Sequence, residues 1–188
     1  MVQNRERRPV RDSDILAEFE CLKGSNQLSH LRLLRIYFYD ARPAEGILKN
    51  PLDQVALDLS KTKKHQSSRM LLDRIANYPD VALRLGDLSV QGWQIGEIAT
   101  KNLLAQSRAI EARDLVPKIT QKGVDLRIGL DIARLALRQL VDTVLVVTAD
   151  SDFVPAFSFA RREGVRVVLD HLGHSIRPEL RANVDVVL

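Results

Sequence analysis

An apolar run that ends in two carboxylates is the feature that most constrains this chain. Residues 143–149 are mostly β-branched or aliphatic, and Asp150, Ser151 and Asp152 follow them directly. An apolar run bounded by polar residues is typical of a buried strand in a parallel sheet. Open α/β sheets bind their ligands beyond the carboxyl ends of the strands. We therefore expect Asp150 and Asp152 to lie at the edge of the sheet where such a fold keeps its chemistry.

The segments around this run alternate between helical and extended patterns. Before it, apolar positions recur at helical spacing and predict a helix whose broad apolar face packs on a sheet: Leu126, Leu130, Ala133, Leu137 and Leu140, with Ile128, Ile132 and Leu135 beside them. After it, the pattern predicts a helix at about 154–163, a strand at 165–170, a helical turn near 175–182 and a last strand at 185–188. Alternation with short connections implies right-handed crossovers in a parallel sheet. The predicted fold class is α/β.

The first half of the chain is less regular. The pattern predicts helices and strands there over these ranges: helix 12–22, strand 33–39, helices at about 51–59 and 66–77, and strand 81–85. Glycines punctuate short apolar runs from residue 86 onward, which suggests a hairpin-like excursion, and we interpret 86–121 as an insertion on the domain surface. Residues 1–188 are expected to form a single domain with a basic tail at 1–11.

Composition narrows the class of protein. The chain has 188 residues, 45% of them hydrophobic, with a net charge of +4, which is compatible with a polyanionic partner without requiring one. Arginines crowd residues 5–11, where a solvated tail is the simpler interpretation. Cys21 is the only cysteine, so no internal disulfide forms and a reducing, cytoplasmic location is expected. Histidines lack zinc-ligand spacing, and no apolar stretch approaches the roughly 20 residues that span a bilayer.

Three acidic residues are expected to converge. A helix antiparallel to its neighbouring strand begins near the carboxyl end of that strand, so Asp125 should lie at the same edge as Asp150 and Asp152. Clustered carboxylates repel one another unless a cation binds or some of them protonate, and Mg²⁺ or Mn²⁺ held by carboxylates and water is the economical solution.

Each of these residues also has a local explanation. Asp125 suits the N-cap of its helix, and Asp150 and Asp152 suit the start of the next helix. Asp131 belongs to a polar stripe with several arginines, so an ordinary ion pair within the helix explains it. Asp40 and Asp170 also end predicted strands, where aspartate is commonly a turn residue.

Two motifs in this order resemble the NYN domain, which belongs to the PIN-like nuclease superfamily and includes the LabA-like proteins. The first is the Lys-Gly-Val-Asp run at 122–125, followed by a helix that carries Asp131. The second is the strand and Asp-Ser-Asp-Phe run at 146–153, followed by a helix and the Gly-Val-Arg-Val-Val run at 164–168. Residues 37–40 are similar to an earlier, tyrosine-rich strand of these proteins. The resemblance covers 33–40 and 120–188 well and 41–119 poorly.

The resemblance implies a Rossmann-like α/β domain that hydrolyses RNA phosphodiester bonds with Mg²⁺ or Mn²⁺. It makes Asp125, Asp150 and Asp152 the catalytic and metal-binding residues, with Asp131 a weaker catalytic member. Ser151 would orient a ligand or water, and Lys122 would face an RNA phosphate, although a solvated loop lysine is equally ordinary. Metal ions in such a site activate water and stabilise charge on the phosphate.

The chain departs from the family at its first strand, which in the family carries an aspartate and, two residues later, an asparagine. No such strand precedes residue 33, so the chain looks like the family with that strand missing or replaced. The neighbours of an absent strand would expose apolar surface that favours a partner, including a second copy of the chain in a homo-oligomer. The alternative function is therefore a catalytically silent RNA-binding or regulatory module of the same fold. A phosphotransferase of the Asp-x-Asp type is a third option. It has little support, because the aspartate pair of such an enzyme comes near the start of its domain, whereas Asp150 and Asp152 come late in this chain.

Overall fold

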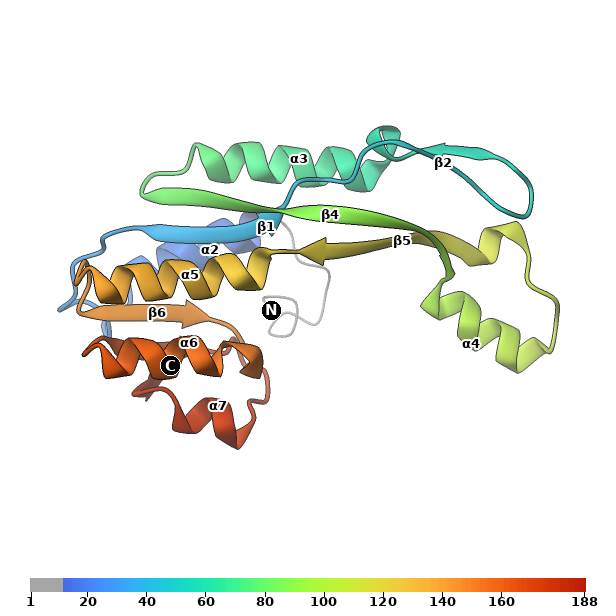
Figure 1. Ribbon diagram of the computed structural model, residues 1–188. Helices are drawn as coiled ribbons and strands as arrows, with labels where there is room; N and C mark the ends of the chain where they lie inside the picture. Colours follow the sequence, from blue (N-terminus) through green and yellow to red (C-terminus); the bar gives the residue numbers. More distant parts are fainter. Residues whose placement is uncertain (1–11) are drawn as a thin grey trace. The chain divides into compact units, whose positions relative to one another are not determined.

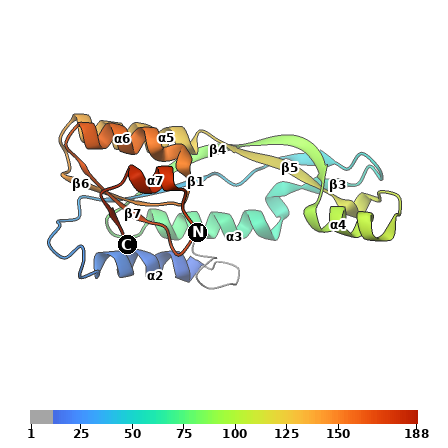
Figure 2. The same cartoon turned by 90° about the horizontal axis from the view of Figure 1, so that it is seen from below.

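The computed structural model describes residues 12–188 (Figures 1 and 2). These residues separate into two compact units. The first unit contains residues 12–37, 79–82 and 125–188, and the second contains residues 38–78 and 83–124. The basic tail expected at 1–11 lies outside the described residues, and the expectation of a single domain over 1–188 stays a prediction. Among residues 12–188, every helix is too short or too polar to cross a membrane.

A parallel sheet organises the first unit. Strands β6 (Thr143–Val147), β7 (Arg166–Asp170) and β8 (Val186–Val187) pair in the order β6-β7-β8, and both pairings are parallel. The register of β6 on β7 runs from Thr143 opposite Arg166 to Val147 opposite Asp170. The predicted strands of this half are confirmed, and the parallel sheet is confirmed for these three strands. The protein as a whole is a mixed α/β structure, because its other sheets include antiparallel pairs.

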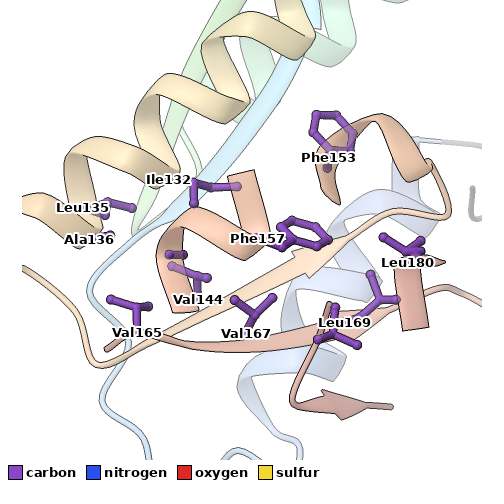
Figure 3. Packing of buried hydrophobic residues seen from close by; sticks show 12 residues of the cluster. Ile132, Leu135, Ala136, Val144, Phe153, Phe157, Val165, Val167, Leu169 and Leu180 are labelled. Carbon is purple, nitrogen blue, oxygen red and sulfur yellow. The ribbon is translucent and has the colours of Figure 1, made fainter. Parts of the chain in front are cut away.

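Three helices connect and cover these strands. They are α5 (Val124–Leu137), α6 (Val154–Arg162) and α7 (Pro178–Ala182), with a short 3₁₀ helix, η3 (Ser151–Phe153), between β6 and α6. Figure 3 shows the core that they share, in which Phe157 of α6 and the inward side chains of β7, Val167 and Leu169, are fully buried. The rings of Phe153 and Phe157 stack with centroids 6.4 Å apart. The predicted helices after residue 125 are therefore present close to their expected bounds.

The apolar face predicted for α5 is confirmed for Ile132 and Leu135 and wrong for its main stripe. The buried side chains of this helix are Ile132, Leu135 and Ala136. The stripe that was expected to pack on the sheet lies largely in solvent, with exposed side chains at Leu126, Leu130, Leu137 and Leu140. The helix carries apolar residues around most of its circumference, so periodicity alone could not tell which face the sheet covers.

The remainder of the first unit contains α2 (Asp12–Lys23), which confirms the helix predicted at 12–22. Strand β1 (Ile36–Ala41) begins three residues later than expected and reaches into the second unit. Residues 12–35 of the described chain contain this helix and turns but no strand. Whether the first strand of the resembled family is missing or replaced stays a prediction.

The second unit is built on a long antiparallel hairpin. Strands β4 (Val81–Ile95) and β5 (Leu115–Lys122) pair from Asp87 opposite Lys122 to Ile95 opposite Leu115, and the register shifts between Val90 and Trp93. Gly92, at φ +94°, lies in that irregularity. Helices α4 (Glu97–Gln106) and η2 (Ala112–Asp114) connect the two strands. The hairpin-like excursion is confirmed, and its role as a surface insertion stays a prediction.

The rest of this unit contains α3 (Lys63–Ala76), which confirms the helix predicted at 66–77. The helix predicted at about 51–59 is wrong. That segment forms a turn, the short strand β3 (Ala56–Asp58) paired antiparallel with β2 (Ile47–Lys49), and the 3₁₀ helix η1 (Leu59–Lys61). Asn50 and Asp53 accept backbone hydrogen bonds from Leu52 and Val55, and such Asx turns compete with helix.

The ends of α5 and α6 use the same C-terminal motif with different residues. At α6, the Val165 N–H donates to Ala160 O and the Gly164 N–H donates to Arg161 O, which is the Schellman pattern. Gly164 has φ +84°. At α5, the equivalent left-handed position is Gln139, at φ +50°. The L side chain of Gln139 makes this conformation unfavourable, whereas Gly164 adopts it freely.

We predict that Gly164→Ala lowers the free energy of unfolding by about 1 kcal/mol, because an L residue is strained there. A Cβ at this position would meet no atom within 4 Å, so the loss is conformational and not steric. Gln139→Gly should instead raise the free energy by about 0.5 kcal/mol, since relief of strain exceeds the added chain entropy. Urea denaturation measures both, and equal effects of the two substitutions would contradict this explanation.

An ion pair between the half-buried Arg108 and the buried Asp114 holds the loop between α4 and β5. Arg108 Nη1 and Nη2 each donate to the Asp114 carboxylate at 2.7 Å, and the Glu111 N–H adds a hydrogen bond of 2.8 Å. The Arg108 guanidinium, followed by the Glu111 N–H, lowers the pKa of Asp114 from 3.8 to about 2. A carboxyl group with a lower pKa in the folded protein stabilises the fold above its unfolded pKa and loses that contribution as the pH falls.

We therefore predict that Asp114 contributes stability at pH values above about 4 and that this contribution disappears as the pH falls toward 2. In Asp114→Asn this part of the pH dependence should be absent, and the variant should be less stable than the parent at pH 7. The matched control is Asp73→Asn, on the exposed side of α3. Denaturant unfolding followed across pH 2–7 provides the measurement, and identical pH profiles for the parent and Asp114→Asn would refute the assignment.

Candidate active site

The carboxyl ends of β6 and β7 form the candidate active site. Figure 1 shows α5 running antiparallel to β6, so that the start of α5 and the end of β6 lie at the same end of the first unit. The two elements share the core through Ile132 and Val144. The helix and the strand that carry Asp125 and Asp150 thus have the expected antiparallel arrangement, and the convergence of the carboxylates themselves stays a prediction.

Asp150 is held in place by its own backbone and by Thr148. Its N–H donates to Thr148 Oγ1 at 3.1 Å, and its Oδ1 accepts the N–H of Asp152 at 2.9 Å as the N-cap of η3. Thr148 is almost fully buried, and its own N–H donates to Asp170 O at the end of β7. The capping explanation of Asp150 is confirmed. Within residues 12–188, Asp150 Oδ2 has no hydrogen-bond partner, so it stays open to solvent.

The other carboxylates at this end are exposed. Asp152 lies within η3, and Asp125 is the second residue of α5. The expectation that Asp125 is the N-cap is therefore wrong. The helix begins one residue earlier, directly after Gly123 at φ +76°. A carboxylate in the first turn is still favourable to the helix dipole. Ser151 is half-buried at the start of η3.

Asp131 is in the ion pair that its sequence neighbours predicted. Its Oδ1 lies 3.5 Å from Arg134 Nε, one helical turn further along α5. Arg134 also donates from Nη2 to Tyr37 Oη at 3.3 Å, which connects the helix to β1. Asp131 is mostly buried and structurally engaged, so its predicted catalytic role has no support beyond the family resemblance.

Two residues near the site were not identified from the sequence as important. Thr148 positions the Asp150 backbone. In the sequence it could have been recognised as a polar residue directly after the apolar run of β6. Asp170 was interpreted as a turn residue, and its Oδ1 indeed accepts the N–H of Leu172 at 2.8 Å. Asp170 is only 3% exposed, beside Thr148 at the end of the central strand. Lys122, the expected phosphate contact, is exposed at the end of β5 in the second unit, and its role stays a prediction.

The acidic residues do not assemble a metal centre as they stand. Among residues 12–188, no three histidine, cysteine, aspartate or glutamate side chains come together in a way that could hold a metal ion. Asp150 gives one oxygen to the cap and Asp131 is paired with Arg134. The site therefore offers single carboxylates at one edge of the sheet, and the predicted set Asp125, Asp150 and Asp152 does not fit a divalent ion in this arrangement.

The cap allows the chemistry of Asp150 to be separated from its structural role. Asparagine is as good an N-cap as aspartate, so we predict that Asp150→Asn changes the free energy of unfolding by less than about 0.5 kcal/mol. Asp150→Ala removes the hydrogen bond to the Asp152 N–H and should cost about 1 kcal/mol. Thermal or urea unfolding of both variants checks this, and a loss in Asp150→Asn as large as that in Asp150→Ala would contradict the capping geometry.

Comparison with known proteins adds a family and one relative. The sequence model of the NYN domain matches residues 58–188. An uncharacterized protein of Methanocaldococcus jannaschii is 29% identical over 98 residues, which are 52% of this chain. The chain spans 38% of the length of that curated relative. No solved structure matches the chain significantly. The family match begins within the region that the motifs covered poorly and extends through the whole candidate site.

Proposed function

Because the chain belongs to the NYN domain family, whose members generally target RNA, we propose that it hydrolyses RNA phosphodiester bonds at the carboxyl ends of β6 and β7. The observation that carries this proposal is the geometry of Asp150. A buried threonine and a helix cap fix its position, while Oδ2 stays open to solvent. A rigid side chain with an open acceptor at this edge of a parallel sheet suits work on a bound ligand.

In this proposal Asp150 orients the attacking water and accepts its proton. Water forms the new bond to phosphorus, the ribose oxygen on the opposite side departs, and that oxygen takes a proton from solvent. General-base assistance of this kind contributes about 10²–10⁴-fold to rate. Asp152 and Asp125 are further carboxylates at this edge, Ser151 is a candidate to orient the water, and Lys122 is a candidate contact for an RNA phosphate.

NYN-domain nucleases typically use divalent metals, so a requirement for Mg²⁺ or Mn²⁺ is an expectation from the family, and the proposed role of Asp150 does not depend on it. The carboxylates in their present arrangement do not supply three ligands, so the requirement has to be tested separately from the role of Asp150. Cleavage should be assayed with Mn²⁺, with Mg²⁺ and with EDTA.

A second function is favoured by the structural use of the same residues. Asp150 caps a helix, Asp131 is in an ion pair, and no metal-binding group of three is formed within residues 12–188. These observations suit a catalytically silent module that binds RNA or regulates a partner. The expected net charge of such a binder is positive, as in this chain.

The deciding experiment compares cleavage of labelled single-stranded and structured RNA by the parent and by Asp150→Asn. We predict that the substitution lowers the cleavage rate by at least about 100-fold, since a carboxamide cannot accept the proton. Asp142→Asn, at the opposite end of β6, is the matched control and should cleave like the parent.

Unchanged cleavage by a folded Asp150→Asn would refute the role of this residue. Absence of cleavage with either metal, together with RNA binding in EDTA that weakens as salt rises, would establish the silent module instead. Absence of both cleavage and binding would refute RNA as the target.

A further inference from the structure

A basic groove lies at the opposite end of the same parallel sheet. It has a volume of about 630 Å³ and is formed by the end of α6, the start of β7 and the segment before β8. Its lining residues are Ser158, Arg161, Arg162, Gly164, Val165, Arg166 and Asp185. Arg166 is opposite Thr143 at the first residue pair of β6 and β7, whereas Asp150 follows their last pair. The groove is therefore distinct from the candidate active site.

One arginine of the groove is structurally committed. Arg161 Nε donates to Asp185 Oδ1 at 2.9 Å, and Arg161 Nη1 donates to Ala182 O at 3.2 Å. Asp185 Oδ2 accepts the Val167 N–H at 2.8 Å, so both oxygens of this carboxylate are occupied. Arg161 thus forms a fixed wall of the groove, and the only carboxylate in the lining is already neutralised by it.

The other two arginines have no such partner. Arg162 makes one long hydrogen bond, from Nε to Ser158 O at 3.3 Å, and Arg166 uses its backbone N–H for Asp142 O. Within residues 12–188, neither guanidinium is in an ion pair, although Glu163 lies between them in the sequence. Three arginines face one carboxylate, which leaves an excess of two positive charges in one concavity.

Helix stability explains only part of this arrangement. A cation in the last turn of α6 is favourable to the helix dipole, which accounts for Arg161 and Arg162. Arg166 is on a strand, and its side chain serves no such purpose. A guanidinium presents a planar fork of donors that matches the oxygens of a phosphate, and its weak hydration makes it easier to desolvate than an ammonium.

We propose that this groove binds the phosphodiester backbone of RNA through Arg162 and Arg166. It would be a second RNA contact, at the end of the sheet opposite Asp150. The proposal rests on RNA as the target of the chain. The groove would contribute RNA affinity that does not depend on sequence, and hydrolysis would take place at the carboxyl ends of β6 and β7. Phosphate contacts of this kind position a nucleic acid without reading its bases.

The test measures RNA binding in EDTA, so that its outcome does not depend on cleavage. The binding of a fluorescein-labelled single-stranded RNA to the parent and to Arg162→Gln/Arg166→Gln is followed by anisotropy from 50 to 200 mM KCl. Each lost phosphate contact lowers the slope of log K against log salt by about 0.7 for a single strand, so the double variant should lose about 1.4. The loss should be the same for RNAs of different sequence.

The matched control is Arg32→Gln/Arg35→Gln, which removes the same charge from exposed residues of the first unit outside the groove. It should leave the slope within about 0.3 of the parent value, less than half the effect of one lost contact. An unchanged slope in the groove variant, or equal losses in both variants, would overturn the groove assignment while leaving RNA binding itself intact. Absence of RNA binding by the parent would overturn the proposed function as well.

Three other anions distinguish the possible ligands of the groove: inorganic phosphate, AMP and polyglutamate. Inorganic phosphate and AMP, added at matched ionic strength, should not displace the RNA if the groove contacts the backbone of a chain. Displacement by either that depends on Arg162 and Arg166 would show a site for a free phosphate and refute the backbone assignment. Polyglutamate that binds with the same dependence on these two arginines would show a site for an acidic protein segment, which also contradicts the proposal.

Discussion

The turn from β6 into η3 and α6 is held by two hydrogen bonds, and the candidate active site depends on them. The buried Thr148 hydroxyl accepts the Asp150 N–H, and the Asp150 carboxylate accepts the N–H of Asp152. Thr148 is in turn bonded to the end of β7 through Asp170 O. One side chain therefore ends a strand, starts a helix and presents a carboxylate oxygen to solvent. Structural and chemical roles coincide in Asp150, and the asparagine substitution separates them.

The sequence predicted the second half of the fold well because its elements are short, regular and bounded by strong signals. The β6 run, Gly164 after α6 and the β7 run were each recognisable from local chemistry. It failed where the signal was ambiguous. The helix α5 is apolar on several sides, so the buried face could not be chosen, and at 50–55 the side chains of Asn50 and Asp53 favoured turns over helix. The length of β4 was also missed, since Gly86 and Gly92 suggested breaks within one continuous strand.

For the candidate site, too, the sequence predicted the features that follow from local pattern and topology, but not those that depend on contacts between side chains. The sequence predicted that Asp125 and Asp150 lie at the same end of the sheet, because the direction of a helix relative to its neighbouring strand follows from topology. It could not predict whether the carboxylates would meet, since capping at Asp150 and the Arg134 pair at Asp131 compete with metal binding. The basic groove was not predicted either. Its arginines come from the end of α6 and the start of β7, and folding brings Asp185, about 20 residues later in the chain, against them.

The central claim is that RNA lies against the turn after β6. Its most direct test is crosslinking of an RNA that contains 4-thiouridine to the full chain in EDTA, with the crosslinked peptides mapped by mass spectrometry. The account predicts adducts within residues 148–153, with reduced yield at 200 mM salt because phosphate contacts are screened. Adducts confined to residues 83–124, with none in the turn after β6, would contradict it.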